Sequence, residues 1–282
     1  MTVRALSIVL LALATAVPAL ADGWPRPKGS GYYQLGFRYV RATQFYEPNS
    51  NIVDIPTLSD YVVSFYGEYG LTDRLTVLAY VPFVERITLN RVEGEDTGFI
   101  FFEGDAVTSI ADADLGIRYG LFKQGNTVLS LSAKLGLPLG QTEQENGLIT
   151  GDGELNQFVG LELGHSFWPA PAYATASAGF NNRINGFSDE LSFKMEGGYT
   201  LAQKLTLIGR VGGVFSLKNG DDPRLGGTGG LYGNNQQYVL FGVEASYTLT
   251  ESLGVSLGAE GATLGENVLA APAFRMGFFV VR

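Results

Sequence analysis

The sequence contains no cysteine and a single histidine, His165. The absence of cysteine excludes disulfides, cysteine-ligated metals, a thiol nucleophile and a lipid anchor on an N-terminal cysteine. One histidine is too few for a metal site built from imidazole ligands, so we expect no metal and no cofactor. The chemistry of this chain must come from carboxylates, basic side chains and aromatic rings.

Long apolar runs are also missing, because after residue 21 none approaches the ~18 residues that a membrane-spanning helix needs. The first 21 residues are different: Arg4 precedes an apolar core over 5–17 and the small-residue box Ala19-Leu20-Ala21. This is the pattern of a secretory signal peptide. We predict cleavage before Asp22, with 22–282 as one domain; an uncleaved anchor helix is the alternative, for which the segment is short.

Basic residues are few, with 19 Lys and Arg against 28 Asp and Glu and a net charge of −9. An acidic chain repels phosphate backbones, so nucleic acid is not an expected partner. The chain is nevertheless rich in particular residues, with 38 Gly, 14 Tyr and 18 Phe. Glycines without a collagen-like period fit the turns and bends of a β-barrel.

The remaining sequence alternates apolar and polar residues with period two. Globular strands usually have about 5–6 residues, whereas a tilted membrane strand needs about 9–11. Most of the alternating segments here are longer than the globular length, which favours an all-β fold, a transmembrane antiparallel up-and-down β-barrel. We count twelve segments: 31–43, 58–70, 74–86, 110–122, 127–139, 154–167, 172–183, 188–201, 204–217, 236–249, 252–263 and 269–281.

Charges in the middle of these segments all fall on the polar face, and Arg183 shares that face. In lipid a sheet must close into a ring, and this face must then look into the lumen. Seven acidic and seven basic residues indicate pairing across the barrel rather than a strongly ion-selective field. Near segment ends, Arg41 and Glu85 fall on the apolar face, where interfacial charge is cheap. The predicted pore-lining residues are Arg38, Glu68, Asp112, Asp114, Arg118, Lys134, Glu162, Lys194, Glu196, Arg210, Glu244, Glu260 and Arg275.

The connections alternate between short and long, as in outer-membrane barrels with short periplasmic turns and longer outer loops. Twelve strands predict a narrow lumen, since eight roughly fill with side chains and 16–18 leave an aqueous channel. The long connection 87–109 carries Phe99-Ile100-Phe101-Phe102, four consecutive apolar residues among acidic ones. We expect this run to plug the barrel mouth; packing against the rim or extending a strand are the alternatives.

Catalysis has two candidates, and we favour neither. An outer-membrane lipase needs a serine two residues from its histidine on the same strand face, but here that position is Phe167, and Ser166 faces the other way. His165 is therefore predicted to be an interfacial residue near the rim. Asp112 and Asp114 lie about 7 Å apart by strand rise and resemble an acid–base pair. Ion pairing inside the barrel is the favoured interpretation.

Several strings resemble the outer-membrane family named for the MetA-pathway of phenol degradation, often labelled simply transporter. They are 69–75 with 81–84, 113–119, and 135–140 leading to 150–153, and the likeness runs over about 30–280. The resemblance implies a porin-like barrel tied to uptake of aromatic or hydrophobic compounds.

The sequence thus predicts an outer-membrane channel, not an enzyme, for passive uptake of small hydrophobic or aromatic solutes. A structural or adhesive barrel with a filled lumen, acting through its outer loops, is the alternative. Expected partners are outer-membrane lipid, lipopolysaccharide, the solute and the barrel-assembly machinery. That machinery usually reads a terminal aromatic residue, where this chain has Arg282.

Overall fold

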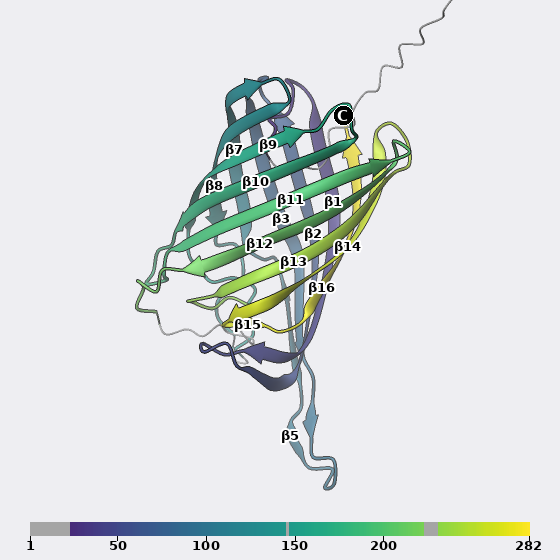
Figure 1. Cartoon of the computed structure of the whole chain (residues 1–282). Helices are drawn as coiled ribbons and strands as arrows, with labels where there is room; N and C mark the ends of the chain where they lie inside the picture. Colours follow the sequence, from purple (N-terminus) through teal and green to yellow (C-terminus); the bar gives the residue numbers. More distant parts are fainter. Residues whose placement is uncertain (1–22, 145–146, 223–230) are drawn as a thin grey trace, which may run out of the picture.

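The computed structural model describes residues 23–144, 147–222 and 231–282 (Figure 1). The predicted signal peptide, residues 1–21, lies outside this part of the chain, so its cleavage stays a prediction. All regular structure in the described residues is β-strand. None of these residues belongs to a helix long and apolar enough to cross a membrane.

Twelve long strands form a closed antiparallel ring. Each pairs with its neighbours along the chain, and the first strand, β1, also pairs with the last, β16, so that the ring has no free edge. The predicted fold class is confirmed. The long strands are β1 (Gly31–Tyr46), β2 (Ile52–Gly70), β3 (Leu75–Leu89), β7 (Ala113–Gln124), β8 (Thr127–Leu137), β9 (Asn156–Ser166), β10 (Ala172–Asn182), β11 (Glu190–Leu201), β12 (Leu205–Ser216), β13 (Gln237–Thr248), β14 (Leu253–Glu266) and β16 (Pro272–Val281).

Period two decides which side chains face outward. On β9, Val159, Leu161 and Leu163 are 46%, 49% and 45% exposed, whereas Gly160 and Glu162 between them face the lumen. Large apolar side chains on the outside are the reverse of a soluble sheet, which buries its apolar face. An apolar outer band around a polar interior is the arrangement that a barrel needs in lipid.

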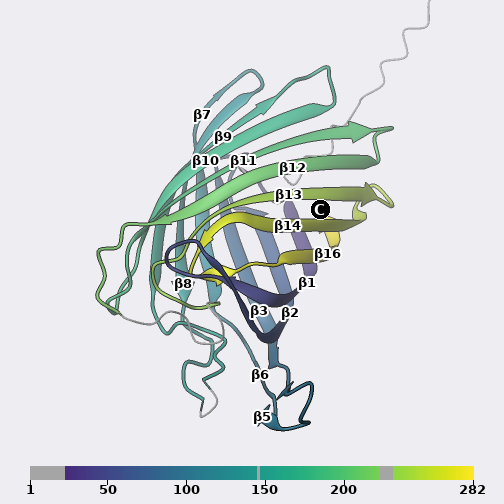
Figure 2. The same ribbon diagram turned by 60° about the horizontal axis from the view of Figure 1, so that its bottom comes forward.

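The two ends of the barrel differ. Short turns join β2 to β3, β7 to β8, β11 to β12 and β13 to β14 at one end, where the C-terminus also lies (Figure 1). The backbone groups of Gly31 and Arg282 hydrogen-bond to each other there, which closes the seam between β1 and β16. Longer connections occupy the opposite end, which is turned toward the viewer in Figure 2. We call these the turn end and the loop end.

A projecting hairpin corrects one prediction. The short strands β4 (Val92–Glu93) and β5 (Ile100–Phe102) pair only with each other and extend beyond the loop end (Figure 1). Phe99 and Phe101 are 62% and 69% exposed, so the predicted plug of Phe99, Ile100, Phe101 and Phe102 is wrong. β4 and β5 pair with each other and not with the barrel wall, so no strand pairing holds residues 99–102 in the mouth.

Gly104, at the base of this hairpin, has a φ of +86°, a conformation that favours glycine. Beyond it, β6 (Asp105–Ser109) returns to the wall and pairs with β3. Two strands away, the short β15 (Val268–Leu269) pairs with β1 in the same way.

A β-bulge in β3 changes the facing of one charge. The register between β2 and β3 shifts opposite Val81–Val84, where Pro82 has no N–H to donate to the ladder. A shift of one residue exchanges the two faces of a strand. Glu85 therefore turns inward and is 1% exposed, which overturns its predicted place on the apolar face.

Candidate functional site

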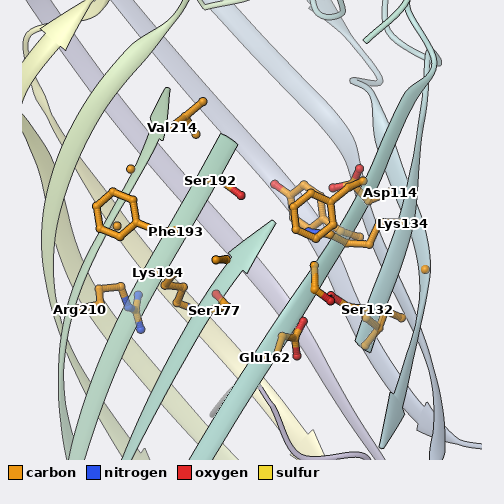
Figure 3. Close-up of a pocket in the computed structure, with 18 of the residues that line it drawn as sticks. Asp114, Ser132, Lys134, Glu162, Ser177, Ser192, Phe193, Lys194, Arg210 and Val214 are labelled. Carbon is orange, nitrogen blue, oxygen red and sulfur yellow. The ribbon is translucent and has the colours of Figure 1, made fainter. Parts of the chain in front are cut away.

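A cavity of about 700 Å³ lies inside the barrel. In Figure 3, Asp114 and Lys134 lie on one side of it, and Lys194 and Arg210 lie on the other. Lys134 places its ammonium 4.4 Å from the centre of the Phe158 ring, a cation–π contact. The lining combines charged, hydroxyl and aromatic side chains from most of the wall.

The chain before β1 closes the turn end. Residues 23–30, the N-terminal segment, lie inside the ring and touch strands on several sides. The Gly23 amide donates to Glu162 Oε2 at 3.1 Å on β9, and Ser130 Oγ on β8 donates to the Gly23 carbonyl at 2.6 Å. The Trp24 indole packs edge-on against Tyr173 on β10. A segment held by three neighbouring strands in this way fills the lumen at this level.

Trp24 also explains a glycine in the wall. A Cβ at Gly164 on β9 would lie only 2.7 Å from the Trp24 ring, so a larger residue there would displace the indole. The wall is thus shaped to receive the N-terminal segment.

Charge pairing and a backbone hydrogen bond also fasten the segment to β2 and β3. Arg26 Nε donates to Glu68 Oε2 at 2.5 Å, and its backbone amide donates to Thr76 Oγ1 at 2.7 Å. Arg118 bridges Glu68, at 3.2 Å, and Glu162, at 2.5 Å. Because two guanidiniums face two carboxylates, each buried charge has an opposite partner, as burial requires.

Apolar packing helps to close the loop end. Leu148, in the connection between β8 and β9, is 1% exposed. It packs with Leu58 on β2, Ile87 on β3 and Val107 on β6, and Leu231 joins this cluster from the connection between β12 and β13. Tyr232 follows Leu231 and donates its hydroxyl to Glu85 Oε2. Inward loops, not the projecting hairpin, cover this side of the mouth.

Asp112 has a different place from the one predicted. It precedes β7 instead of lying on it, and its carboxylate accepts the amides of Gly140 at 2.8 Å and Asp152 at 3.0 Å. Burial, opposed by these amides, raises the pKa of Asp112 to about 6. Asp112 fastens the connection between β8 and β9, and it does not form an acid–base pair with Asp114, which lines the cavity.

The same connection is fastened by Arg183, just after β10. Its guanidinium binds Asp152 at 2.9 Å, Glu190 at 2.8 Å and Glu154. Burial raises the pKa of Glu154 to about 7, opposed by Arg183 and reinforced by Asp152. Arg183 thus forms ion pairs with three carboxylates at the loop end. Like Asp112, it stabilises a loop instead of lining the lumen as an unpaired charge.

The other predicted charges lie on the inner face of the wall. Glu196 forms ion pairs with Arg210 at 3.3 Å and with Lys194 at 3.5 Å, and Glu244 accepts a hydrogen bond from Arg210 Nη2 at 3.0 Å. Glu68 is covered by the N-terminal segment. Those that border the cavity itself are Arg38, Asp114, Arg118, Lys134, Glu162, Lys194, Arg210, Glu260 and Arg275.

Four contributors were missed at the sequence level. Asp60 lies an even number of residues from Glu68 on the same strand, so the alternation indicated that it faces the lumen. Pro82, inside a strand, was the signal for the bulge that turns Glu85 inward. Arg26 and Tyr232 lie outside the strands, where no periodicity indicates facing.

His165 points away from the lumen. Its Nδ1 is 2.8 Å from Thr127 Oγ1, and its ring packs edge-on against Phe167 at 4.8 Å. Ser166 lies on the other face of β9, so the histidine and serine do not meet in the arrangement that a lipase needs.

Solved structures with similar architecture are outer-membrane proteins. The crystal structure of the COG4313 outer membrane channel from Pseudomonas putida F1 superposes with a TM-score of 0.67 at 14% identity, over 93% of this chain and 98% of that one. The fold is that of an outer-membrane β-barrel.

Two further barrels agree with this. The NanC porin has a TM-score of 0.54 at 6% identity, over 89% of this chain and 99% of its own. The translocator domain of the autotransporter NalP from Neisseria meningitidis has a TM-score of 0.51 at 11% identity, over 90% and 89%. No family model matches the sequence, and neither does any curated protein. At these identities the likeness establishes the shared barrel architecture.

Proposed function

We propose that this protein is an outer-membrane channel for the passive uptake of small solutes that carry an apolar or aromatic body. The observation that carries the proposal is the cavity of about 700 Å³ enclosed by the ring of strands. Its size falls within the range of about 300–1,000 Å³ that is typical of small-molecule sites.

The surroundings of the cavity support passage rather than storage. The outer wall is apolar and suited to lipid, while the inner wall carries hydroxyls and charges that hold water. Among the described residues, the N-terminal segment lies between this cavity and the turn end, and the inward loops lie between it and the loop end. Movement of these elements would connect the cavity to both sides of the membrane.

Conductance across a planar bilayer tests the proposal. The intact protein is expected to give low current, and a variant lacking 23–30 is expected to give a several-fold higher, stable current. Proteoliposomes with the same variant should take up benzyl alcohol faster than protein-free vesicles. A deletion variant that inserts fully and passes neither ions nor solute would refute the channel.

Partners follow from this location. We infer contact of the apolar outer band with membrane lipid, of the loop end with lipopolysaccharide, and of β16 with the barrel-assembly machinery. Insertion into vesicles with and without the purified assembly machinery tests the last contact.

A structural or adhesive role is the second candidate, and the projecting hairpin is the observation that favours it. Phe99 and Phe101 stack edge-on at 5.1 Å and stand exposed beyond the loop end. Removing 92–102 should abolish adhesion and leave uptake unchanged if both activities exist. Loss of uptake in that variant would count against a channel that works through its lumen.

We infer no catalytic activity. The lipase alternative requires a serine nucleophile beside His165 on one face of β9, and that face carries Phe167 instead. Release of fatty acid from phospholipid vesicles by the purified protein would overturn this inference.

A further inference from the structure

Two arginines lie directly opposite each other on the inner wall. Arg38 of β1 is the register partner of Arg275 of β16, across the seam that closes the ring. Both border the cavity. Like charges at directly opposed positions of neighbouring strands repel each other and destabilise the pairing. A pair placed this way in the middle of a wall needs negative charge nearby.

Carboxylates flank the pair on both sides. Arg38 Nη2 donates to Asp60 Oδ2 at 2.8 Å on β2, and Arg275 Nη2 donates to Glu260 Oε1 on β14. The strands run in the order β2, β1, β16, β14 around the ring, so the row is acid, arginine, arginine, acid. The carboxylates lie at the outside of the row, and the space before the two guanidiniums is left to the cavity.

Exposure separates the two signs of charge. The Arg38 and Arg275 side chains are 34% and 44% exposed, whereas their partners Asp60 and Glu260 are 0% and 14% exposed. An anion in the cavity therefore meets guanidinium groups directly. A cation at the same place would find Asp60 fully buried and Glu260 only 14% exposed.

An ion pair on another part of the wall also exposes its base more than its acid. Lys194 on β11 is 36% exposed, and Glu196, its partner at 3.5 Å, is 2% exposed. Bases also outnumber acids among the charged residues that border the cavity: six are basic (Arg38, Arg118, Lys134, Lys194, Arg210 and Arg275) and three are acidic (Asp114, Glu162 and Glu260). Although the whole wall carries similar numbers of each, the cavity surface favours anions.

The free donors of the pair suit a carboxylate. A guanidinium has five N–H donors, and among the described residues each of these two donates only through Nη2. Two guanidiniums side by side can bind both oxygens of one carboxylate by parallel, charge-assisted hydrogen bonds. Phosphate would fit the donors, but the neighbouring surface is not purely polar.

Rings and an aliphatic side chain border the same end of the cavity. Tyr80, Tyr238 and Leu240 line it with the arginines. Tyr80 lies within electrostatic range of Arg38, and Tyr238 lies within range of both arginines. An acid group before the guanidiniums would leave the body of its molecule against these side chains.

We propose that Arg38 and Arg275 form a carboxylate-binding site, and that the solute is a small aromatic or apolar monocarboxylic acid. This rests on the proposed function and names the class of solute that the channel accepts. A neutral hydrocarbon would contact the tyrosine rings but would supply no negative charge to Arg38 and Arg275.

Direct binding tests the site without requiring transport. The full chain, purified in detergent, is titrated by calorimetry with benzoate and with benzyl alcohol, which has the same ring and no charge. We expect the affinity for benzoate to exceed that for benzyl alcohol by at least about tenfold, as for one charge-assisted bidentate contact. Arg275→Gln should reduce this preference to less than about threefold.

Arg275→Gln is the main variant, because its partner Glu260 stays near water, whereas Arg38→Gln strands the fully buried Asp60. Lys204→Gln, an exposed cation in the turn between β11 and β12, is the matched control and should bind benzoate like the parent. Heat-modifiable mobility in gel electrophoresis confirms that each variant is folded.

The outcomes separate the site from the channel. Equal affinity for the two compounds, or a benzoate preference that survives Arg275→Gln in folded protein, overturns the site and leaves the channel intact. Selective binding without flux in proteoliposomes supports the site and removes the channel. Selective binding with faster benzoate flux, both lost in Arg275→Gln, supports the two together.

Discussion

Tyr232, in the connection between β12 and β13, donates its hydroxyl to Glu85 on β3, 147 residues away in the chain. The contact joins a loop to the wall at a carboxyl that is 1% exposed. Since Leu231 beside it packs into the apolar cluster at the same level, the hydrogen bond helps to hold the loop inward. The closure of the loop end depends on this bond as well as on apolar packing.

Replacing Tyr232 with phenylalanine keeps the ring and removes the hydroxyl. The Glu85 carboxyl then loses its donor, at a cost of about 1–3 kcal/mol for a buried group. We expect faster amide hydrogen exchange in 231–236 and more frequent brief openings in single-channel records. Tyr247→Phe, on the apolar outer face, is the control and should change neither. Unaltered exchange in the Tyr232 variant would show that apolar packing alone holds the loop.

Acidity should tighten the loop between β8 and β9. The pKa of Asp112 rises from an ordinary 3.8 to about 6, and that of Glu154 from 4.5 to about 7, so the docked loop binds protons that the free loop releases. Docking is most stable below the ordinary values and weakens as pH rises through about 6 and then 7. Limited proteolysis of 147–155 should therefore be faster at about pH 8 than at about pH 5.

The charges that face these acids are Asp152, Arg183 and Glu190. Of these, Arg183 stays charged throughout the range and opposes the effect at Glu154. Asp112→Asn should remove the change in cleavage rate near pH 6 and keep the change near pH 7 that comes from Glu154. A cleavage rate that does not vary with pH in the parent protein would contradict the prediction.

One arginine substitution on each face of the wall tests which side chains contact lipid and which face the lumen. Leu161, at the centre of β9, points outward, and an arginine there should destabilise the membrane-inserted barrel by about 2–4 kcal/mol. Ser192 on β11 lines the cavity with Gly179 and Val214 as its register partners, and Ser192→Arg should cost little because the new charge faces the polar lumen instead of lipid. Guanidinium unfolding in lipid vesicles measures both. Equal stability of the two variants would be incompatible with lipid contact on the Leu161 face.

Arg26 should control the turn end. Arg26→Ala removes the ion pair between the N-terminal segment and Glu68, so the segment should leave the lumen and the mean current should rise several-fold. Lys28→Ala changes an exposed charge two residues away and should leave the current unchanged. If both variants conduct like the parent, backbone and Trp24 contacts suffice to keep the segment in place.

The strands were predictable because lipid on one side and water on the other force period two on every long strand. The predicted segment 127–139 and the observed β8 (Thr127–Leu137) begin at the same residue, and 204–217 differs from β12 (Leu205–Ser216) by one residue at each end. The facing of Arg38, Glu162 and Lys194 followed from the same alternation. Fold and inner wall were thus accessible from the sequence.

The rest depended on shifts and distant contacts that alternation does not encode. One bulge at Pro82 moved Glu85 to the inner face, and Asp112 left the strand to bind loop amides. The N-terminal segment has no period, and its position depends on lumen partners such as Glu68, 42 residues beyond Arg26. The opposition of Arg38 and Arg275 required the seam register between the first and last strands.

Arg118 binds both Glu68 and Glu162, and this has a consequence for the segment that occupies the turn end. If Arg26 withdrew, neither carboxylate would be stranded, since each would retain the bridging guanidinium, and Arg26 itself would be rehydrated in bulk water. The N-terminal segment is therefore a detachable stopper: its departure leaves Arg118 shared between two carboxylates, one positive charge short of balance, and breaks none of the strand pairing that closes the barrel.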